Sequence, residues 1–310
     1  MIPKGYDTGA SLRWRATRGL VGAVFPRRCA PQSRQHLPRV VLAGMGVAAA
    51  RAGLLALRGA RGLDRTNFRG RTVSLSGGPA LALAASATSA LGAPSRASAS
   101  AALVAGLGAG SVGLYDDVVG RRPGQQAKGF RGHVRALREG RVTSGLVKVA
   151  GVGAAALIAS ALLPPRNRSP FRRGIDVLLG AGVIAGSANL VNLLDLRPGR
   201  AAKVALAVAT PMLSGPTGTL LAGPVGATTA VLPHDLDEEI MLGDCGANAL
   251  GALLGVGLAA RTGTAGRAAV LAGLVALTAA SEKVSFTKVI DSTPALRAID
   301  QLGRRSNPRT

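Results

Sequence analysis

The chain has 310 residues, of which 47% are apolar, 3% are aromatic and 17% are charged. Soluble domains carry about 25% charged residues. This composition, with 43 glycines, therefore argues against an ordinary soluble core and favours helices that pack through small residues in lipid. The net charge of +23 lies in short basic segments between long uncharged stretches, with few aromatic residues for base stacking, which argues against a nucleic-acid partner. The pattern is typical of a multi-pass membrane protein with basic cytoplasmic loops.

Residues 1–38 are polar and rich in arginine, and no apolar run among them is long enough to span a bilayer. We expect this segment to lie outside the fold, as a disordered or interfacial extension or as the product of an upstream start codon. From residue 39 to residue 290, apolar stretches alternate with polar breaks, and residues 291–310 form a cytoplasmic C-terminal tail. The sequence therefore predicts an all-α, polytopic membrane helix bundle with about nine transmembrane helices, two of which (201–232) could instead form a re-entrant hairpin. The predicted spans are 39–59, 78–96, 98–115, 144–163, 174–191, 201–214, 217–232, 245–260 and 265–281.

The loops predict the orientation in the cell membrane. Segments 61–71 and 121–142 are both basic, and one pair of spans separates them, so both are expected on the cytoplasmic side. The basic loop 164–173 falls on the opposite side and counts against this topology. Three further loops share the cytoplasmic side: 192–200, 233–244 and 282–310.

Four carboxylates lie at the ends of predicted spans, all on the predicted cytoplasmic side: Asp116, Asp117, Asp195 and Asp244. An acidic residue at membrane level is a functional candidate, although any one of them could instead end a helix or pair with an arginine. Asp116 and Asp117 are adjacent and repel each other, so a bound cation is the natural way to keep both ionised. Carboxylate oxygens suit Mg²⁺, which binds through one or two carboxylates and the phosphates of a substrate. We therefore predict that the positive partner of Asp244 is a magnesium ion carrying a phosphate.

Two other motifs have simpler interpretations. The segment "GLGAGSVG" (106–113) lies within an apolar stretch, so its glycines are interpreted as helix-packing positions and not as a dinucleotide-binding loop. The segment "HDLDEE" (234–239) is interpreted as a solvated loop, although it directly precedes the motif that contains Asp244.

Five segments follow one another in an order that is typical of one known family. They are "DRTNFRGRTVSLSGG" (64–78), "GLYDDVVG" (113–120), "GLVKVAG" (145–151), "NLVNLLDLRPG" (189–199) and "MLGDCGANALG" (241–251). They resemble the first cytoplasmic loop, the double-aspartate motif, the lysine after the long loop, the Asn-rich motif and the Met-Gly-Asp motif of the polyprenyl-phosphate N-acetylhexosamine-1-phosphate transferases. This family includes phospho-N-acetylmuramoyl-pentapeptide translocase. The residues that carry the resemblance are Asn67, Arg71, Gly77, Gly78, Asp116, Asp117, Lys148, Asn189, Asn192, Asp195 and Asp244.

The resemblance implies a Mg²⁺-dependent attack of polyprenyl phosphate on the β-phosphate of a UDP-sugar, in loops on the cytoplasmic side. The products are a lipid-linked diphosphosugar for cell-envelope glycans and UMP. The resemblance implies that Asp244 and Asp117 bind the metal, while Asp116, Asp117 and Asp195 are catalytic. The expected partners are the lipid, the UDP-sugar and the membrane, and a homodimer is left open. The expected substrate-binding residues are Lys148, Asn189, Asn192, Arg197 and Arg200, of which the two arginines could instead bind anionic lipid.

Two features depart from the family's pattern. Pro198 stands where a second aspartate is usual, and no histidine-rich loop follows the last predicted span. Two interpretations remain: an enzyme for a different phosphosugar, with Lys283, Lys288 or Arg297 contacting its anionic end, or a catalytically inactive relative. The inactive relative would serve as a lipid-phosphate-binding or scaffold subunit of envelope assembly. We favour the enzyme, and we disfavour a transporter because its carboxylates would lie near the middle of the membrane.

Overall fold

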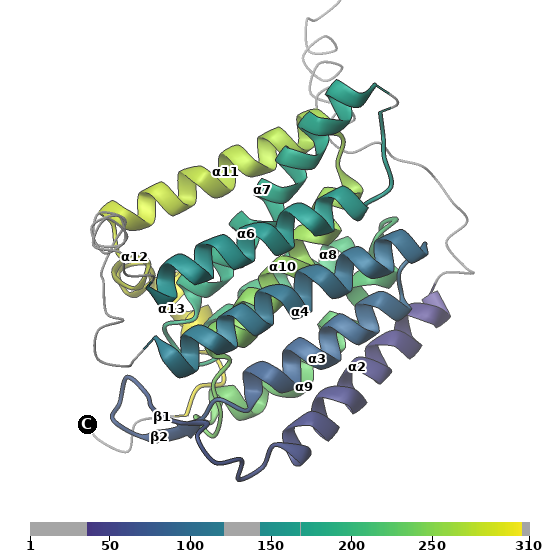
Figure 1. The fold of residues 1–310 in the computed structure, drawn as a ribbon. Coiled ribbons are helices and arrows are strands. Elements are labelled where there is room, and N and C mark those ends of the chain that lie inside the picture. Colours follow the sequence, from purple (N-terminus) through teal and green to yellow (C-terminus); the bar gives the residue numbers. More distant parts are fainter. Residues whose placement is uncertain (1–35, 121–142, 168, 306–310) are drawn as a thin grey trace, which may run out of the picture.

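The computed structural model describes residues 36–120, 143–167 and 169–305. In this part of the chain, long helices lie side by side in one bundle, and a β-hairpin and two short helices gather at its left-hand end in Figure 1. The predicted all-α bundle is therefore confirmed for the described residues. The expected extension, up to residue 35, and the basic loop 121–142 lie outside the described residues.

Eleven helices and one two-stranded hairpin make up the described part of the chain. The strands pair antiparallel, with Asp64 opposite Ser74 and Thr66 opposite Thr72. The elements are α2 (His36–Ala56), β1 (Asp64–Thr66), β2 (Thr72–Ser74), α3 (Gly77–Leu91), α4 (Arg96–Val119), α6 (Ser144–Leu162), α7 (Pro170–Leu194), α8 (Arg200–Met212), α9 (Gly218–Leu236), α10 (Gly243–Arg261), α11 (Thr264–Lys283), α12 (Phe286–Ser292) and α13 (Pro294–Gln301).

Six of the described helices are long and apolar enough to cross a membrane, namely α2, α4, α6, α7, α10 and α11. They indicate a multi-pass membrane protein, but the predicted number of nine spans is wrong. Helices α3 and α8 have only 15 and 13 residues, whereas a spanning helix needs about 20, and α9 contains two prolines and a polar last turn. The turn between α8 and α9 still reaches the far ends of two long helices, because Arg39 donates to Gly215 O at 3.1 Å and Arg261 donates to Met212 O at 3.4 Å.

Helix α10 forms the centre of the bundle, and α3, α4, α7, α8 and α9 pack around it. Its small residues allow neighbouring backbones to approach closely: a Cβ atom at Gly251 would lie 2.6 Å from the Cα atom of Ala188 in α7. The outer helices instead expose large apolar side chains, such as Leu178 of α7 (67% exposed) and Val149 of α6 (71% exposed). A centre of small residues within an apolar exterior is the arrangement that membrane helices favour.

Of the loops that were predicted to share one side of the membrane, those that the structure describes lie together at one end of the bundle. Strand β2 pairs with the segment before α10, because the Ser74 N–H group donates to Glu239 O at 3.1 Å and the Met241 N–H group donates to Ser74 O at 2.8 Å. The Arg305 N–H group donates to Leu236 O at 3.3 Å, which brings the C-terminal segment to the same end. The described residues of the segment 164–173 lie at the other end, where Arg166 donates to Ala260 O near the end of α10. The described loops at the first end are 61–71, 192–200, 233–244 and 284–305.

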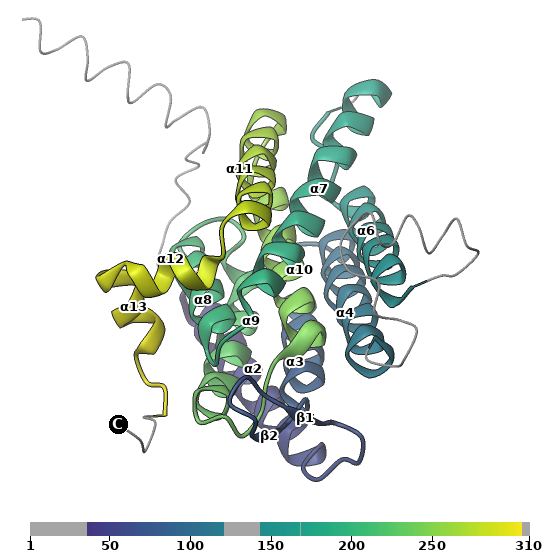
Figure 2. The same ribbon diagram turned by 90° about the vertical axis from the view of Figure 1, so that its left-hand side faces the viewer.

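Helices α12 and α13 project from this end of the bundle (Figure 2) and are attached to α8 by a buried ion pair. Arg200, the first residue of α8, is 3% exposed, and it donates from Nε and Nη2 to the two carboxylate oxygens of Asp300 at 2.8 and 3.0 Å. Arg304 donates to the same carboxylate at 2.7 Å. Burial favours a raised pKa for Asp300, but the hydrogen bonds from Arg200 and the charge of Arg304 outweigh it and hold the pKa below its ordinary value. The described part of the predicted tail is therefore docked on the bundle.

The substitution Asp300→Asn is expected to lower the free energy of unfolding by about 2 kcal/mol. It preserves the shape of the side chain but leaves the Arg200 guanidinium buried without a full negative charge. Thermal unfolding of the purified protein in detergent measures this change. Asp291→Asn, on the exposed side of α12, is the matched control, and an equal melting temperature for the two variants would contradict the prediction.

Candidate functional site

The end of α4 and the start of α10 are joined by a carboxylate. Asp117 accepts hydrogen bonds from the N–H groups of Asp244 at 3.1 Å and Cys245 at 3.0 Å. These donors belong to the first turn of α10, where N–H groups have no partner within the helix and the helix dipole favours negative charge. Gly113 makes the approach possible, because a Cβ atom there would collide with the backbone of Asp244. The glycine run 106–113 therefore acts in helix packing, as predicted.

A lysine from α6 lies between the carboxylates of Asp116 and Asp244. The Lys148 ammonium group contacts Asp244 Oδ2 directly and lies 3.5 Å from Asp116 Oδ2. The three side chains are only 19 to 27% exposed, so their charges interact through a medium that screens less than water does. The positive partner of Asp244 in the structure is thus Lys148, where the sequence predicted a magnesium ion.

Asn192, near the end of α7, completes this group of side chains. With its amide oriented to suit its neighbours, it donates to Asp244 Oδ1 at 2.7 Å and accepts from Lys148 Nζ at 3.0 Å. Four helices thus contribute to one cluster at the end of the bundle. We call this set the carboxylate cluster: Asp116, Asp117, Lys148, Asn192 and Asp244.

Asp195 follows α7 and lies next to the carboxylate cluster. Its carboxylate accepts a hydrogen bond from the N–H group of Gly243, which opens α10 with a φ angle of 58°. Burial raises the pKa of Asp195 well above its ordinary value, and the nearby carboxylates of Asp235, Asp244 and Asp117 raise it further. A carboxyl group whose pKa is raised by such an environment is suited to hold or accept a proton during a reaction.

An apolar groove of about 670 Å³ begins at the carboxylate cluster and runs between α6, α7 and α11. Apolar side chains such as Val152, Leu271 and Leu274 line much of it. Its polar lining residues are Lys148, Asn189, Asn192, Asn248, Thr278 and the carboxylate Glu282. All three of these helices are long and apolar enough to cross a membrane. The groove therefore connects charged groups at the end of the bundle with a surface expected to face lipid.

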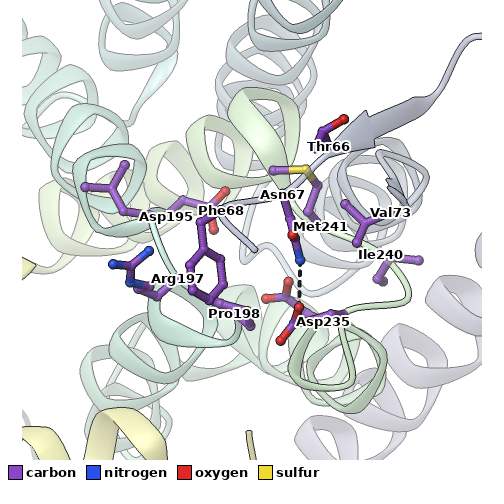
Figure 3. Close-up of a pocket in the computed structure, with 12 residues that line it drawn as sticks. Thr66, Asn67, Phe68, Val73, Asp195, Arg197, Pro198, Asp235, Ile240 and Met241 are labelled. Carbon is purple, nitrogen blue, oxygen red and sulfur yellow. Dashed lines mark hydrogen bonds between the residues drawn. The ribbon is translucent and has the colours of Figure 1, made fainter. Parts of the chain in front are cut away.

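A second, smaller pocket of about 190 Å³ is lined by Asp195 and by residues of the β-hairpin and of the segment before α10 (Figure 3). Its lining includes Phe68 and Arg197, whose guanidinium carbon lies 4.2 Å from the centre of the Phe68 ring. Asn67 donates to Glu238 at 2.7 Å at the same pocket, which joins the β-hairpin to the segment before α10. The pocket thus combines an aromatic ring, a cation and several hydrogen-bonding groups.

The segment 234–239 is not the solvated loop that the sequence suggested. Asp235 and Glu238 are only 3% and 4% exposed. Asp235 accepts from the Gly199 N–H group at 2.8 Å and so holds the turn that carries Asp195 and Arg197. Acidic residues in a polar segment normally indicate solvent exposure. The only sequence signal that these two residues belong to the site was their position directly before the Asp244 motif.

Asp235 is expected to make the stability of the protein depend on pH. Burial raises its pKa to about 6, although the Gly199 N–H group and the charges of Arg304 and Lys203 act in the opposite direction. Because the folded protein holds this proton more tightly than the unfolded chain, the stabilisation is full below about pH 4 and is lost as the pH rises through 6. Asp235→Asn stays uncharged, so its stability relative to the wild type should increase by about 3 kcal/mol between pH 4 and pH 7.

Thermal unfolding across this pH range tests the prediction. The matched control is Asp237→Asn, which removes an exposed carboxylate two residues away. A difference between wild type and Asp235→Asn that stays constant from pH 4 to pH 8 would contradict it.

Three of the predicted substrate-binding residues lie outside the carboxylate cluster. Asn189 is exposed in the apolar groove and donates to Thr278 Oγ1 at 3.2 Å. Arg197 lines the second pocket. Arg200 is engaged by Asp300, as described above, and the structure gives it a structural partner in place of the predicted substrate phosphate.

The carboxylate cluster suits a hard cation. Oxygens of Asp116 and Asp244 already converge on one positive group, the Lys148 ammonium. Within the described residues, no group of three or more His, Cys, Asp or Glu side chains is arranged to hold a metal ion. Mg²⁺, however, usually takes one or two protein carboxylates and completes its shell with substrate phosphates and water. The donors therefore fit a magnesium ion that binds together with a diphosphate.

Comparison with known protein families finds no family that matches the chain, and comparison with curated proteins finds no matching relative. The functional argument therefore depends on the geometry of the carboxylate cluster and the two cavities beside it.

Proposed function

We propose that the protein transfers a phosphosugar from a UDP-sugar to polyprenyl phosphate, with Mg²⁺ as cofactor, in the synthesis of cell-envelope glycans. The observation that carries the proposal is that Lys148 and Asn192 of the carboxylate cluster line one cavity, while Asp195, next to the cluster, lines a second one. The apolar groove between α6, α7 and α11 opens among membrane-crossing helices, and the smaller pocket faces the loops at the end of the bundle. A lipid acceptor needs an apolar groove that is open to the membrane, and a nucleotide-linked donor needs a polar pocket outside it.

The apolar groove is the proposed site of the lipid acceptor. Its apolar lining would hold part of the polyprenyl chain, and it presents Lys148 and Asn192 to the phosphate. An ammonium group attracts a phosphate strongly where water is partly excluded. Asp116, 3.5 Å from the lysine, would keep the ammonium group in position.

The smaller pocket is the proposed site of the nucleotide. Arg197, whose guanidinium group lies over the Phe68 ring, can reach phosphate oxygens. The diphosphate of the donor would then lie toward Asp195 and the start of α10.

The reaction follows from this arrangement. An oxygen of the lipid phosphate attacks the β-phosphorus of the UDP-sugar, a new P–O bond forms, and the bond from the β-phosphorus to the bridging oxygen breaks to release UMP. Mg²⁺, held by Asp244 and Asp116, would neutralise the charge that develops on the diphosphate. Asp117, whose two oxygens accept N–H groups of α10, would hold the first turn of that helix in place. Asp195, with its raised pKa, can accept a proton from the lipid phosphate before the attack.

The active-site end of the bundle is proposed to face the cytoplasm at the cell membrane. The hairpin segment at this end carries Arg58, Arg61, Arg65, Arg69 and Arg71, which the positive-inside rule places on that side. UDP-sugars are also made on that side of the membrane.

The direct test is UMP release by the purified protein in detergent with Mg²⁺, undecaprenyl phosphate and a panel of UDP-sugars. We expect release with at least one sugar, dependent on both the lipid and Mg²⁺. No release from folded protein that still binds the lipid phosphate would refute the transferase.

One observation favours the second candidate, a non-catalytic lipid-phosphate-binding or scaffold subunit. Lys148 contacts Asp244 and approaches Asp116, so the cluster is neutralised in part without a metal. Lipid-phosphate binding that persists without Mg²⁺, together with absence of UMP release, would identify this alternative.

A further inference from the structure

A cavity of about 570 Å³ lies at the end of α2, away from the carboxylate cluster. Its lining includes Arg51 of α2, Arg58 of the turn that follows α2, and Ser74 and Ser76. Ser74 ends β2 and Ser76 precedes α3. Leu75, between them, lies against Gly243 beside Asp117, whereas the two serines line this cavity.

The two arginines of this cavity lack the partners that charged groups in such a place normally have. Arg51 belongs to a helix that is apolar and long enough to cross a membrane, where a charged side chain is costly unless it reaches a polar partner. Both side chains are exposed, and among the described residues neither forms an ion pair with a carboxylate. Both guanidinium groups are therefore open to a ligand from outside the chain.

The remaining groups of the cavity indicate an anion. Two guanidinium groups can form paired hydrogen bonds with phosphate oxygens, and the serine hydroxyls can donate as well. Ser76 also precedes the first turn of α3, whose N–H groups favour a negative ligand. Glu239 is the only acidic residue in the lining, and it is engaged by His234 at 2.8 Å.

We propose that this cavity binds the phosphate of an anionic phospholipid headgroup. The position at the end of an apolar helix favours a lipid over a free phosphate, because Leu54 and the 69% exposed Leu55 of α2 also line the cavity. The headgroup phosphate would lie between Arg51 and Arg58, with the acyl chains along α2. The site is separate from the transfer reaction and does not depend on it.

The test is native mass spectrometry of the full-length protein released from phosphatidylglycerol-containing detergent micelles. Arg51→Gln/Arg58→Gln should retain at least fivefold less phosphatidylglycerol than the wild type. The matched control is Arg61→Gln/Arg71→Gln, which removes the same charge from two exposed arginines of the same segment that do not line the cavity. This control should retain as much lipid as the wild type.

Two comparisons identify the ligand. In both, the elution volume in size-exclusion chromatography checks that each variant is folded. Phosphatidylcholine should be retained equally by the wild type and both double variants, because its net charge is zero. Addition of 10 mM inorganic phosphate should leave retention of phosphatidylglycerol unchanged. Equal retention by the two double variants, or full displacement by inorganic phosphate, would overturn the proposal.

Discussion

The substitution Asp244→Asn is expected to reduce UMP release by about 10³-fold. The variant preserves the size of the side chain, but it removes the charge that contacts Lys148 and that is proposed to hold Mg²⁺. Loss of one group that stabilises charge in the transition state typically costs 10²–10³-fold in rate, and weakened metal binding adds to this loss. The measurement is the initial rate of UMP release at saturating lipid and UDP-sugar, over a range of Mg²⁺ concentrations.

Asp291→Asn is the matched control for this variant, because it removes a carboxylate from the exposed side of α12 at the same end of the molecule. We expect the control to have wild-type activity. A rate for Asp244→Asn within threefold of the control would show that this carboxylate has no part in the reaction. Asp116 remains beside Lys148 when Asp244 is replaced, so the variant should still fold, which thermal unfolding checks.

The substitution Lys148→Met is expected to reduce kcat/KM for the lipid acceptor by about 10²-fold. Methionine keeps the length of the side chain along α6 but offers no positive charge to a phosphate at the end of the apolar groove. It also leaves the carboxylates of Asp116 and Asp244 without the ammonium group between them. Steady-state kinetics with varied lipid concentration at saturating UDP-sugar measure this effect.

Two further variants make the result specific. Lys148→Arg retains the charge and should recover part of the activity, with a larger effect on the KM for the lipid than on kcat. Arg96→Met removes an exposed positive charge at the opposite end of the bundle, at the start of α4, and should have no effect. Equal kinetics for Lys148→Met and Arg96→Met would contradict the proposed lipid-phosphate site.

The proposed site depends on the close packing of small residues around α10. Gly113 lets α4 approach the backbone of Asp244, and Gly243 adopts a positive φ angle that turns the chain into α10. In this way the first turn of α10 offers its N–H groups to Asp117 and Asp195 at once. Small residues in the helices thus let the backbones approach closely enough to bring the aspartates of the proposed site together.

The sequence by itself determined the class of fold and the main members of the site. Long apolar stretches between polar breaks are a property of the local chain, so the positions of the helices could be predicted from hydropathy. Alternate loops of a membrane bundle lie on the same side of the membrane. The carboxylates that follow or precede the predicted spans could therefore be assigned to one end of the bundle. The structure brings Asp116, Asp117 and Asp244 together there, while their roles in catalysis remain predictions.

Only the tertiary structure decided which groups actually meet. The number of membrane-crossing helices was predicted too high, because hydropathy does not register that α3 and α8 are too short for the bilayer. The pairing of Arg200 with Asp300 joins residues a hundred positions apart, and the burial of Asp235 and Glu238 depends on β2 and the turn after α7. Contacts of this kind depend on how the helices pack against one another, and no local pattern of residues records that packing.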